Sequence, residues 1–199
     1  MDLGGFILAG GRSSRMGTDK SLLRFGDSTL IESALNRLGS VTTKVSIVSP
    51  RDDLAKYAPV VHDVYPGSGP LGGIHAALAS SKHELNLMLA VDMPLVPVQL
   101  LQNLLAVAQQ SGAVVTVPQT GDGFQPLCAV YRKEFAMLAE RALQGDDYKI
   151  DRLFKQTETR VVNEAELEKW GYNSQIFMNL NTPDDLRRTV PGVSSKDKA

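Results

Sequence analysis

Short apolar runs alternate with amphipathic stretches along most of this 199-residue chain. Such alternation is typical of strands and helices that follow one another around a mostly parallel sheet. The sequence therefore predicts an α/β, Rossmann-like fold, with helices on both faces of the sheet. The apolar runs that predict strands are residues 6–9, 45–48, 60–62, 85–91, 113–117 and 127–131, with weaker candidates at 161–162 and 176–178.

The amphipathic stretches predict helices because their apolar residues recur every three or four positions. In residues 29–38 this spacing is followed by Gly39, a typical stop signal. Thr182 and Pro183 announce a final helix, as N-cap and first helical residue. Three further helices are predicted over residues 71–81, 97–110 and 133–143. The run 85–91 is the most apolar, so we expect it in the centre of the sheet.

Composition narrows the class of protein. The formal net charge is −1, which argues against a general affinity for nucleic acid or anionic membranes. No apolar run approaches the ~20 residues of a membrane-spanning helix, and no basic residue precedes the first one. The single cysteine, Cys128, fits a reducing compartment, and its apolar surroundings predict a small buried side chain. We expect a cytoplasmic protein with one domain over residues 1–190 and a disordered tail over 191–199.

The first loop with unusual composition follows the first predicted strand. From Leu8 to Lys20 it reads L-A-G-G-R-S-S-R-M-G-T-D-K. Glycines directly after a buried strand let the backbone approach a ligand, and the cations that follow suit a triphosphate. The loop matches neither a Walker A sequence nor a dinucleotide-binding G-x-G-x-x-G. The alternative is a flexible connection with solvated cations.

Two carboxylates follow other predicted strands. Asp92 comes directly after the most apolar run. Magnesium is typically held by one or two carboxylates together with substrate phosphates and water, so Asp92 is a candidate ligand. Asp63 follows the short third strand and could accept hydrogen bonds from a base or ribose. The alternative for both residues is a role in a turn or a helix cap.

Two further segments offer polar groups to a ligand. Residues 66–73 contain four glycines and two prolines before a predicted helix, and their amides could bind an anionic group. Asn179 and Asn181 lie two positions apart in a segment that we expect to be extended, so both point to one side. Asn181 could instead serve a turn before the last helix. Ligands of open α/β sheets bind beyond the carboxyl ends of the strands, so we expect loops 10–20, 63–73 and 92–97 to converge.

Other polar and aromatic residues have simpler interpretations. The three histidines, His62, His75 and His83, lack metal-ligand spacing, and we interpret them as structural. Trp170 and Tyr172 are expected to close the core.

Taken together, the segments resemble the molybdenum cofactor guanylyltransferases of the bacterial molybdopterin-nucleotide family. The resemblance covers residues 6 to about 188 and rests on four motifs in order: L-A-G-G-x-S-x-R-M-G-x-D-K, G-P-L-x-G, D-M-P and N-x-N-T-P-x-D-L. It implies a fold of the nucleotide-diphospho-sugar transferase type. It also implies the transfer of GMP from GTP to molybdenum-molybdopterin, with Mg²⁺ as cofactor and diphosphate as the second product.

The resemblance also implies roles for individual residues. The guanine nucleotide would contact Leu8, Ala9, Gly10, Gly11, Lys20, Asp63 and Asp92. Within that set Asp92 would bind Mg²⁺, and Lys20 and Arg15 would stabilise phosphate charge. The pterin or the reacting phosphates would contact Gly69, Gly73, Asn179 and Asn181. Ser49 stands near a further nucleoside contact of the family but does not match its common asparagine, and residues 124–127 resemble an element near the second substrate.

The residues leave three alternatives open. The enzyme could be a molybdopterin cytidylyltransferase, or it could act on another small phosphorylated acceptor, because base specificity depends on few contacts. A third alternative is a catalytically idle protein that binds the nucleotide or the cofactor. The presence of both Lys20 and Asp92 argues against it. Transient contact with molybdopterin-loading proteins or molybdoenzymes is a further expectation.

Overall fold

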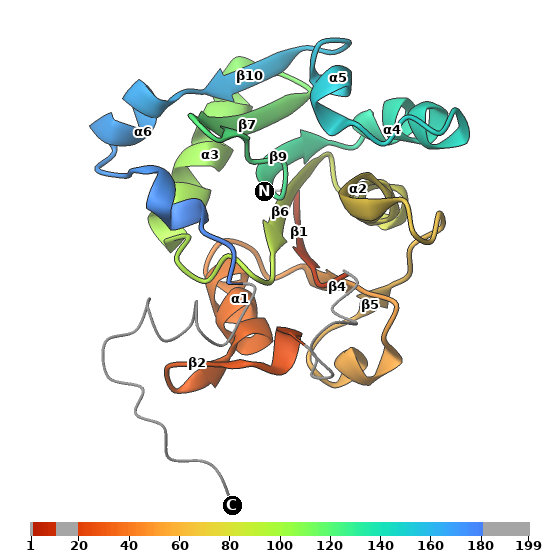
Figure 1. The fold of residues 1–199 in the computed structure, drawn as a ribbon, viewed down its shortest axis with the longest axis vertical. Coiled ribbons are helices and arrows are strands. Elements are labelled where there is room, and N and C mark those ends of the chain that lie inside the picture. The colour runs from red at the N-terminus through yellow and green to blue at the C-terminus, as the bar shows by residue number, and fades with distance from the viewer. Residues whose placement is uncertain (1, 11–19, 181–199) are drawn as a thin grey trace, which may run out of the picture.

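The computed structural model describes residues 2–10 and 20–180, which form a mixed sheet with helices on both faces (Figure 1). The order of the strands is β10-β7-β9-β6-β1-β4-β5, and β8 pairs with β7 outside this path. The strands are β1 (Leu3–Leu8), β4 (Val45–Val48), β5 (Val60–Val61), β6 (Leu85–Ala90), β7 (Val115–Thr120), β8 (Gly123–Phe124), β9 (Cys128–Arg132) and β10 (Thr159–Val162).

Most neighbouring strands run parallel. β1 is parallel to both β4 and β6, β4 to β5, and β7 to β10. The exception on the main path is β9, which runs antiparallel between β6 and β7. All six residues of β6 are buried, and β6 lies in the middle of the strand order, as its apolar composition predicted. The predicted α/β class with a mostly parallel sheet is confirmed.

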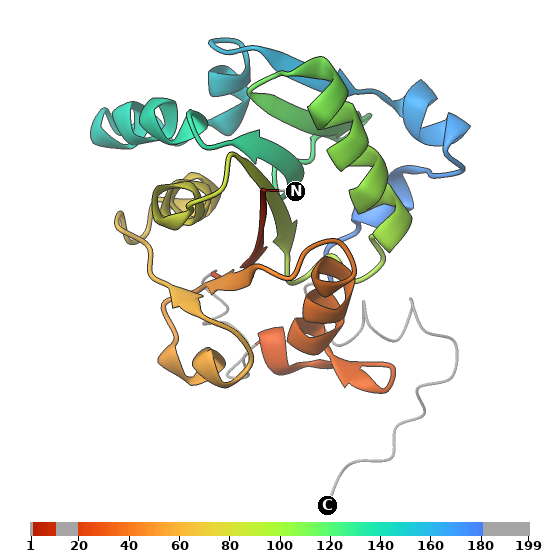
Figure 2. The same ribbon diagram turned by 180° about the vertical axis from the view of Figure 1, so that it is seen from behind.

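The helices form two layers, one on each face of the sheet (Figures 1 and 2). One layer contains α1 (Leu30–Gly39), α3 (Val98–Ser111) and α6 (Glu164–Lys169). The other contains α2 (Gly69–Ser80), α4 (Phe135–Gln144) and α5 (Ile150–Phe154). Each layer encloses its own cluster of buried apolar side chains against the sheet, so the alternating faces of the strands separate two cores.

Local signals explain where the longer helices begin and end. Thr29 caps α1, and its hydroxyl accepts the Glu32 N–H while the Glu32 carboxylate accepts the Thr29 N–H. α3 ends at Gly112, whose φ of 69° is a left-handed conformation that glycine adopts without strain. Cys128 lies in β9 and is fully buried, which raises the pKa of its thiol to about 12. Its predicted role as a small buried side chain is confirmed.

Several sequence predictions differ from the structure. The strand expected over residues 176–178 is instead the end of a 3-10 helix, η3 (Ser174–Phe177). Its apolar residues pack against the core without joining the sheet, and a run this short has no periodicity that separates the two outcomes. α2 begins at Gly69, two residues before the predicted start, with Pro70 in its first turn. The final helix after Thr182 and the tail over 191–199 lie outside the described residues.

Short elements were not predicted. Besides α5, α6 and β8, they are η1 (Lys20–Leu22), β2 (Arg24–Phe25), β3 (Ser28–Thr29) and η2 (Asp52–Lys56).

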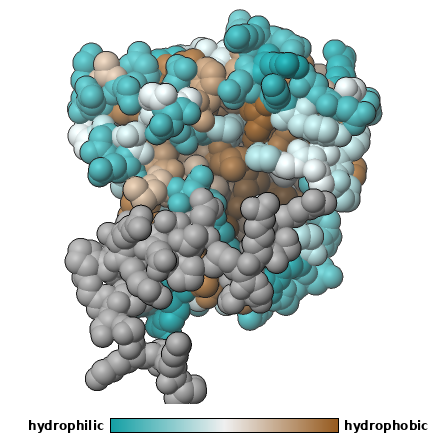
Figure 3. Space-filling model, in the orientation of Figure 1, coloured by the Kyte–Doolittle hydropathy of each residue, from teal (hydrophilic) through white to brown (hydrophobic). Residues whose placement is uncertain are grey.

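Within the described residues, no helix is long and apolar enough to cross a membrane. On the face seen in Figure 1, polar residues cover most of the described surface and apolar residues gather near its centre (Figure 3).

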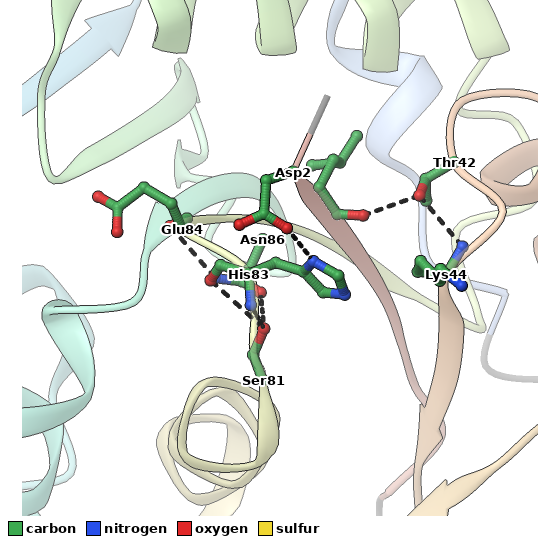
Figure 4. A network of polar contacts seen from close by, with 8 residues as sticks. Asp2, Thr42, Lys44, Ser81, His83, Glu84 and Asn86 are labelled. Carbon is green, nitrogen blue, oxygen red and sulfur yellow. Dashed lines mark hydrogen bonds and ion pairs between the residues drawn. The ribbon is translucent and has the colours of Figure 1, made fainter.

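A polar network closes the amino edge of the sheet (Figure 4). Asn86, fully buried in β6, accepts the hydroxyl of Ser81 and donates to the carbonyl of His83 at 3.1 Å. The His83 ring contacts the carboxylate of Asp2, and this hydrogen bond lowers the pKa of that carboxyl. His83 is therefore structural, as predicted, and belongs to the edge opposite the carboxyl ends of β1 and β6.

Candidate active site

The chain changes direction in the sheet around β1. After β1 it builds β4 and β5 on one side, and α2 then returns it to β6 on the other side. In open α/β sheets the crevice at such a switch point is the usual ligand site. Register pairs Leu8 with Ala90, so the segments that leave β1 and β6 emerge side by side. Two backbone bonds, Val91 N–H to Leu8 at 3.1 Å and Ala9 N–H to Val48 at 2.9 Å, continue the pairing past the strand ends.

Lys20 and Asp92 meet at this edge. The Nζ atom of Lys20 donates to Oδ2 of Asp92 at 2.6 Å, although the residues are 72 positions apart. Both side chains are mostly shielded, with exposed fractions of 19% and 22%. A hydrogen bond between two charged groups in such surroundings is strong. The predicted convergence of the first loop with the loop after β6 is thus confirmed at these two residues.

The asparagine motif is held beside Asp92. The Leu180 N–H donates to the carbonyl of Asp92 at 2.9 Å, and the Leu180 side chain is fully buried. Asn179 is exposed directly before this anchor, at the same edge. Asn181 lies outside the described residues, as do Gly11, Arg12 and Arg15 of the first loop.

Asp63 lies against the first turn of α2. Its Oδ1 accepts the Tyr65 N–H at 2.8 Å, the turn contact that the alternative interpretation implies. Its Oδ2 lies 2.6 Å from where a Cβ atom on Gly72 would stand. Gly72 thus leaves the space that this carboxylate occupies. Contact of Asp63 with a nucleoside stays a prediction.

The predicted glycines differ in their surroundings. Gly10 and Gly69 are exposed, and a Cβ atom on either would meet no atom of the described residues within 4 Å. Gly73 instead packs on the sheet, where a Cβ atom would lie 3.7 Å from the Leu8 side chain and 3.9 Å from Val48. These are ordinary van der Waals distances, so a Cβ atom would fit at position 73 without displacing its neighbours. Leu8 is buried in the core below α2, and Ala9 is half-buried beside the open Gly10.

Two residues at this edge had little or no sequence signal. The buried Ser49 follows β4, and its hydroxyl donates to the Ala9 carbonyl at 3.4 Å. The carbonyl of Ser49 contacts Nδ1 of His62 at 3.1 Å, which gives that histidine a structural partner. Arg37 of α1 reaches the loop after Asp92 and donates to the Met93 carbonyl at 2.6 Å. An arginine in an amphipathic helix is normally predicted to be solvated, so no local sequence pattern indicates this contact.

The Asp92 carboxylate at this edge is a suitable ligand for a hard divalent cation that is shared with a substrate. Among the described residues, no group of three or more His, Cys, Asp or Glu side chains could enclose a metal. Asp92 does present a carboxylate that already holds one cation, the Lys20 ammonium. A single protein carboxylate suits magnesium, because phosphate oxygens and water supply its remaining ligands.

Comparisons with known proteins agree with this geometry. Residues 5–161 match the family model of the MobA-like NTP transferase domain. A probable molybdenum cofactor guanylyltransferase of Pelotomaculum thermopropionicum is 36% identical over 92% of this chain and 89% of that protein. One of Peptoclostridium acidaminophilum is 33% identical over 92% and 86%. The molybdopterin-guanine dinucleotide biosynthesis protein A of Archaeoglobus fulgidus has a TM-score of 0.79 at 28% identity, over 93% of this chain and 95% of that structure.

The mostly parallel sheet defines an α/β protein, and the family match together with the named relatives places it in the nucleotide-transferring class. The same matches identify the family. The chain belongs to the MobA-like NTP transferases and is a nucleotidyltransferase, which confirms the resemblance drawn from the sequence.

Proposed function

We propose that this protein transfers GMP from GTP to molybdenum-molybdopterin, forming the guanine dinucleotide cofactor and diphosphate. The observation that carries the proposal is the 2.6 Å contact between Lys20 and Asp92 at the switch point of the sheet. One triphosphate could contact Lys20 directly there and Asp92 through a bound divalent cation. The names of the relatives supply the base and the acceptor.

The reaction needs positioning more than proton transfer. A terminal phosphate oxygen of molybdopterin attacks the α-phosphorus of GTP in line, and a new phosphorus–oxygen bond forms. The bond between that phosphorus and the bridging oxygen breaks, and diphosphate leaves with the electron pair. The nucleophile is already anionic, so no general base is obligatory, and catalysis consists of orientation and charge stabilisation.

Lys20 and Asp92 would stabilise the phosphate charge in different ways. The Lys20 ammonium would contact phosphate oxygens, and Arg15 would add a second cation. Asp92 would hold Mg²⁺ together with phosphate oxygens and water. The metal, when bound, would neutralise charge on those oxygens. Asp63 would contact the nucleoside, while Gly69, Gly73, Asn179 and Asn181 would lie toward the pterin or the reacting phosphates.

Replacement of the carboxylate tests the proposal most directly. Asp92→Asn keeps the size of the side chain and removes its charge, so we expect diphosphate release from GTP and molybdenum-molybdopterin to be lost. Lys20→Ala should lower the rate by about 10²–10³, the usual effect of removing one preorganised charge-stabilising donor. Glu84→Gln is a matched control, because it breaks an ion pair with Arg132 at the amino edge. Near wild-type turnover in folded Asp92→Asn protein would refute the assigned role.

Base specificity is tested by comparing GTP with CTP and ATP as donors. We expect GTP to give the largest kcat/KM. A preference for CTP would make the protein a cytidylyltransferase of the same fold. Binding of GTP without diphosphate release in the presence of molybdenum-molybdopterin would instead support the idle binding protein. The cytoplasmic location, the single domain over residues 1–190 and transient contact with molybdoenzymes stay predictions.

A further inference from the structure

Arg37 of α1 inserts its guanidinium against the loop that carries Asp92. Its Nε donates to the Ser33 carbonyl of its own helix at 3.1 Å. Its Nη1 donates to the carbonyl of Met93 at 2.6 Å and to that of Val96 at 3.2 Å. One side chain therefore bridges both ends of the turn that follows Asp92.

The surroundings of Arg37 are unusual for an arginine. Its Nη2 is buried and has no hydrogen-bond partner among the described residues. No carboxylate of residues 2–10 or 20–180 forms an ion pair with it, and its acceptors there are backbone carbonyls. Burial lowers the pKa of the guanidinium to about 10, which leaves it protonated at neutral pH. A buried cation without an anionic partner is costly, and an apolar side chain would cover the same core without that cost.

The loop itself is held weakly by its own backbone. The Met93 N–H to Ala90 bond is 3.3 Å long, and the Val96 N–H to Met93 bond is 3.4 Å long. The contact of Arg37 with the Met93 carbonyl is much shorter, and it involves a charged donor. Asp92 directly precedes Met93, so the direction of its carboxylate depends on how this turn is fixed.

We propose that Arg37 is a positioning residue for Asp92, which fixes the turn after Asp92 by holding the Met93 and Val96 carbonyls. It acts from below the loop and touches neither the nucleotide nor the metal. The inference rests on the proposed function, because it takes Asp92 as a ligand of the divalent cation. Outer contacts that orient a metal ligand typically change metal affinity about 10–100-fold when they are removed.

The experiment measures Mn²⁺ binding to the full chain in the presence of GTP, by electron paramagnetic resonance of the free ion. For Arg37→Met we expect a dissociation constant for Mn²⁺ raised about tenfold or more. Arg37→Lys keeps the charge, but its side chain is one atom shorter and lacks the Nε that donates to Ser33, so its affinity for Mn²⁺ should lie between those of wild type and Arg37→Met. Thermal unfolding of each variant records the loss of stability separately.

Arg132→Met is the matched control. Arg132 also donates to two backbone carbonyls, those of Gly112 at 3.0 Å and Ala113 at 3.2 Å, but it does so at the opposite edge. We expect it to lower the Tm while leaving the dissociation constant for Mn²⁺ within about twofold of wild type. Equal Mn²⁺ affinities in folded Arg37→Met and Arg132→Met would overturn the proposal. If Arg37→Met does not fold, wild-type Mn²⁺ affinity in Arg37→Lys would overturn it.

Asp92→Asn separates this inference from the function on which it rests. Wild-type protein that binds Mn²⁺ no more tightly than Asp92→Asn would refute the metal role of Asp92, and both proposals would fail. Binding that depends on Asp92 but is unchanged by loss of Arg37 would refute the positioning role alone.

Discussion

The site depends on a few side chains whose neighbours leave them little freedom. Lys20 and Asp92 form a shielded pair, and Asp63 lies in a space that only a glycine at position 72 provides. The sequence identified Asp63 and Asp92 because each follows an apolar strand, and Lys20 because it is a cation of the glycine-rich loop. It did not predict that the absence of a side chain at Gly72 makes room for Asp63, because crowding between a loop and a helix has no local pattern.

Gly72→Ala tests this crowding at the level of one atom. The added Cβ would stand 2.6 Å from Oδ2 of Asp63, so the carboxylate or the start of α2 must shift. We expect the free energy of unfolding to fall by about 1–3 kcal/mol, the usual cost of an overpacked site. Urea unfolding measures this change. If Asp63 contacts the nucleoside, the KM for GTP should rise as well.

Gly39→Ala is the control for Gly72→Ala. Gly39 is the last residue of α1, and within residues 2–10 and 20–180 a Cβ atom there would meet no neighbour closer than 4 Å. We expect its free energy of unfolding to change by less than about 1 kcal/mol, or to increase, since alanine reduces the freedom of the unfolded chain. Equal effects of the two substitutions would show that the contact with Asp63 is not the cause.

Among the elements, α1 links local sequence signals to the site. Its capping box fixes the amino end, its buried face packs on the sheet, and its last turn carries Arg37. The helical spacing and the stop at Gly39 were predicted. The contact of Arg37 with the loop after Asp92 was not predicted. It depends on how the sheet places α1 beside residues 93–96.

The cap of α1 should make stability depend on pH. The backbone N–H of Thr29, and then its hydroxyl, lower the pKa of Glu32 below its ordinary value of 4.5. A lowered folded pKa means that this contribution is fully present above about pH 4.5 and is lost as the pH falls through the folded value. We expect wild type to lose its advantage over Glu32→Gln in free energy of unfolding as the pH is lowered from about 7 to below 4.5.

Urea unfolding of both proteins across this range provides the measurement. Thr29→Ala should cost about 1 kcal/mol at neutral pH, because the helix loses its N-cap. A constant difference between wild type and Glu32→Gln at every pH would contradict the role assigned to the Glu32 carboxylate.

At the scale of the whole molecule, two cores on opposite faces hold one sheet, and the ligand edge lies where β1 separates β4 from β6. A ligand at this edge would contact loops from several strands at once. Its binding should therefore stabilise the folded chain as a unit.

We expect GTP with Mg²⁺ to raise the Tm of the protein. A ligand at a hundredfold excess over its dissociation constant contributes about 2.7 kcal/mol. For a chain of this length, that corresponds to roughly 5–10 °C. Asp92→Asn should lose the part of the shift that requires Mg²⁺ and keep a smaller shift with GTP alone. Differential scanning fluorimetry measures the Tm of both proteins. An equal shift in wild type and Asp92→Asn, with and without Mg²⁺, would contradict the metal role of Asp92.

The sequence by itself determined the class of the fold, the central place of β6 and most helices, and it predicted the segments that we expect to bind the ligand. These features depend on apolar periodicity, glycine and proline signals and short motifs, all of which act within a few residues. Only the tertiary structure decided that β9 runs antiparallel, that residues 174–177 form a 3-10 turn, and that Lys20 touches Asp92. The buried contacts of Arg37 and Gly72 belong to the same group. They arise from segments that are far apart in the chain, and their geometry exists only after the sheet and its helices have packed.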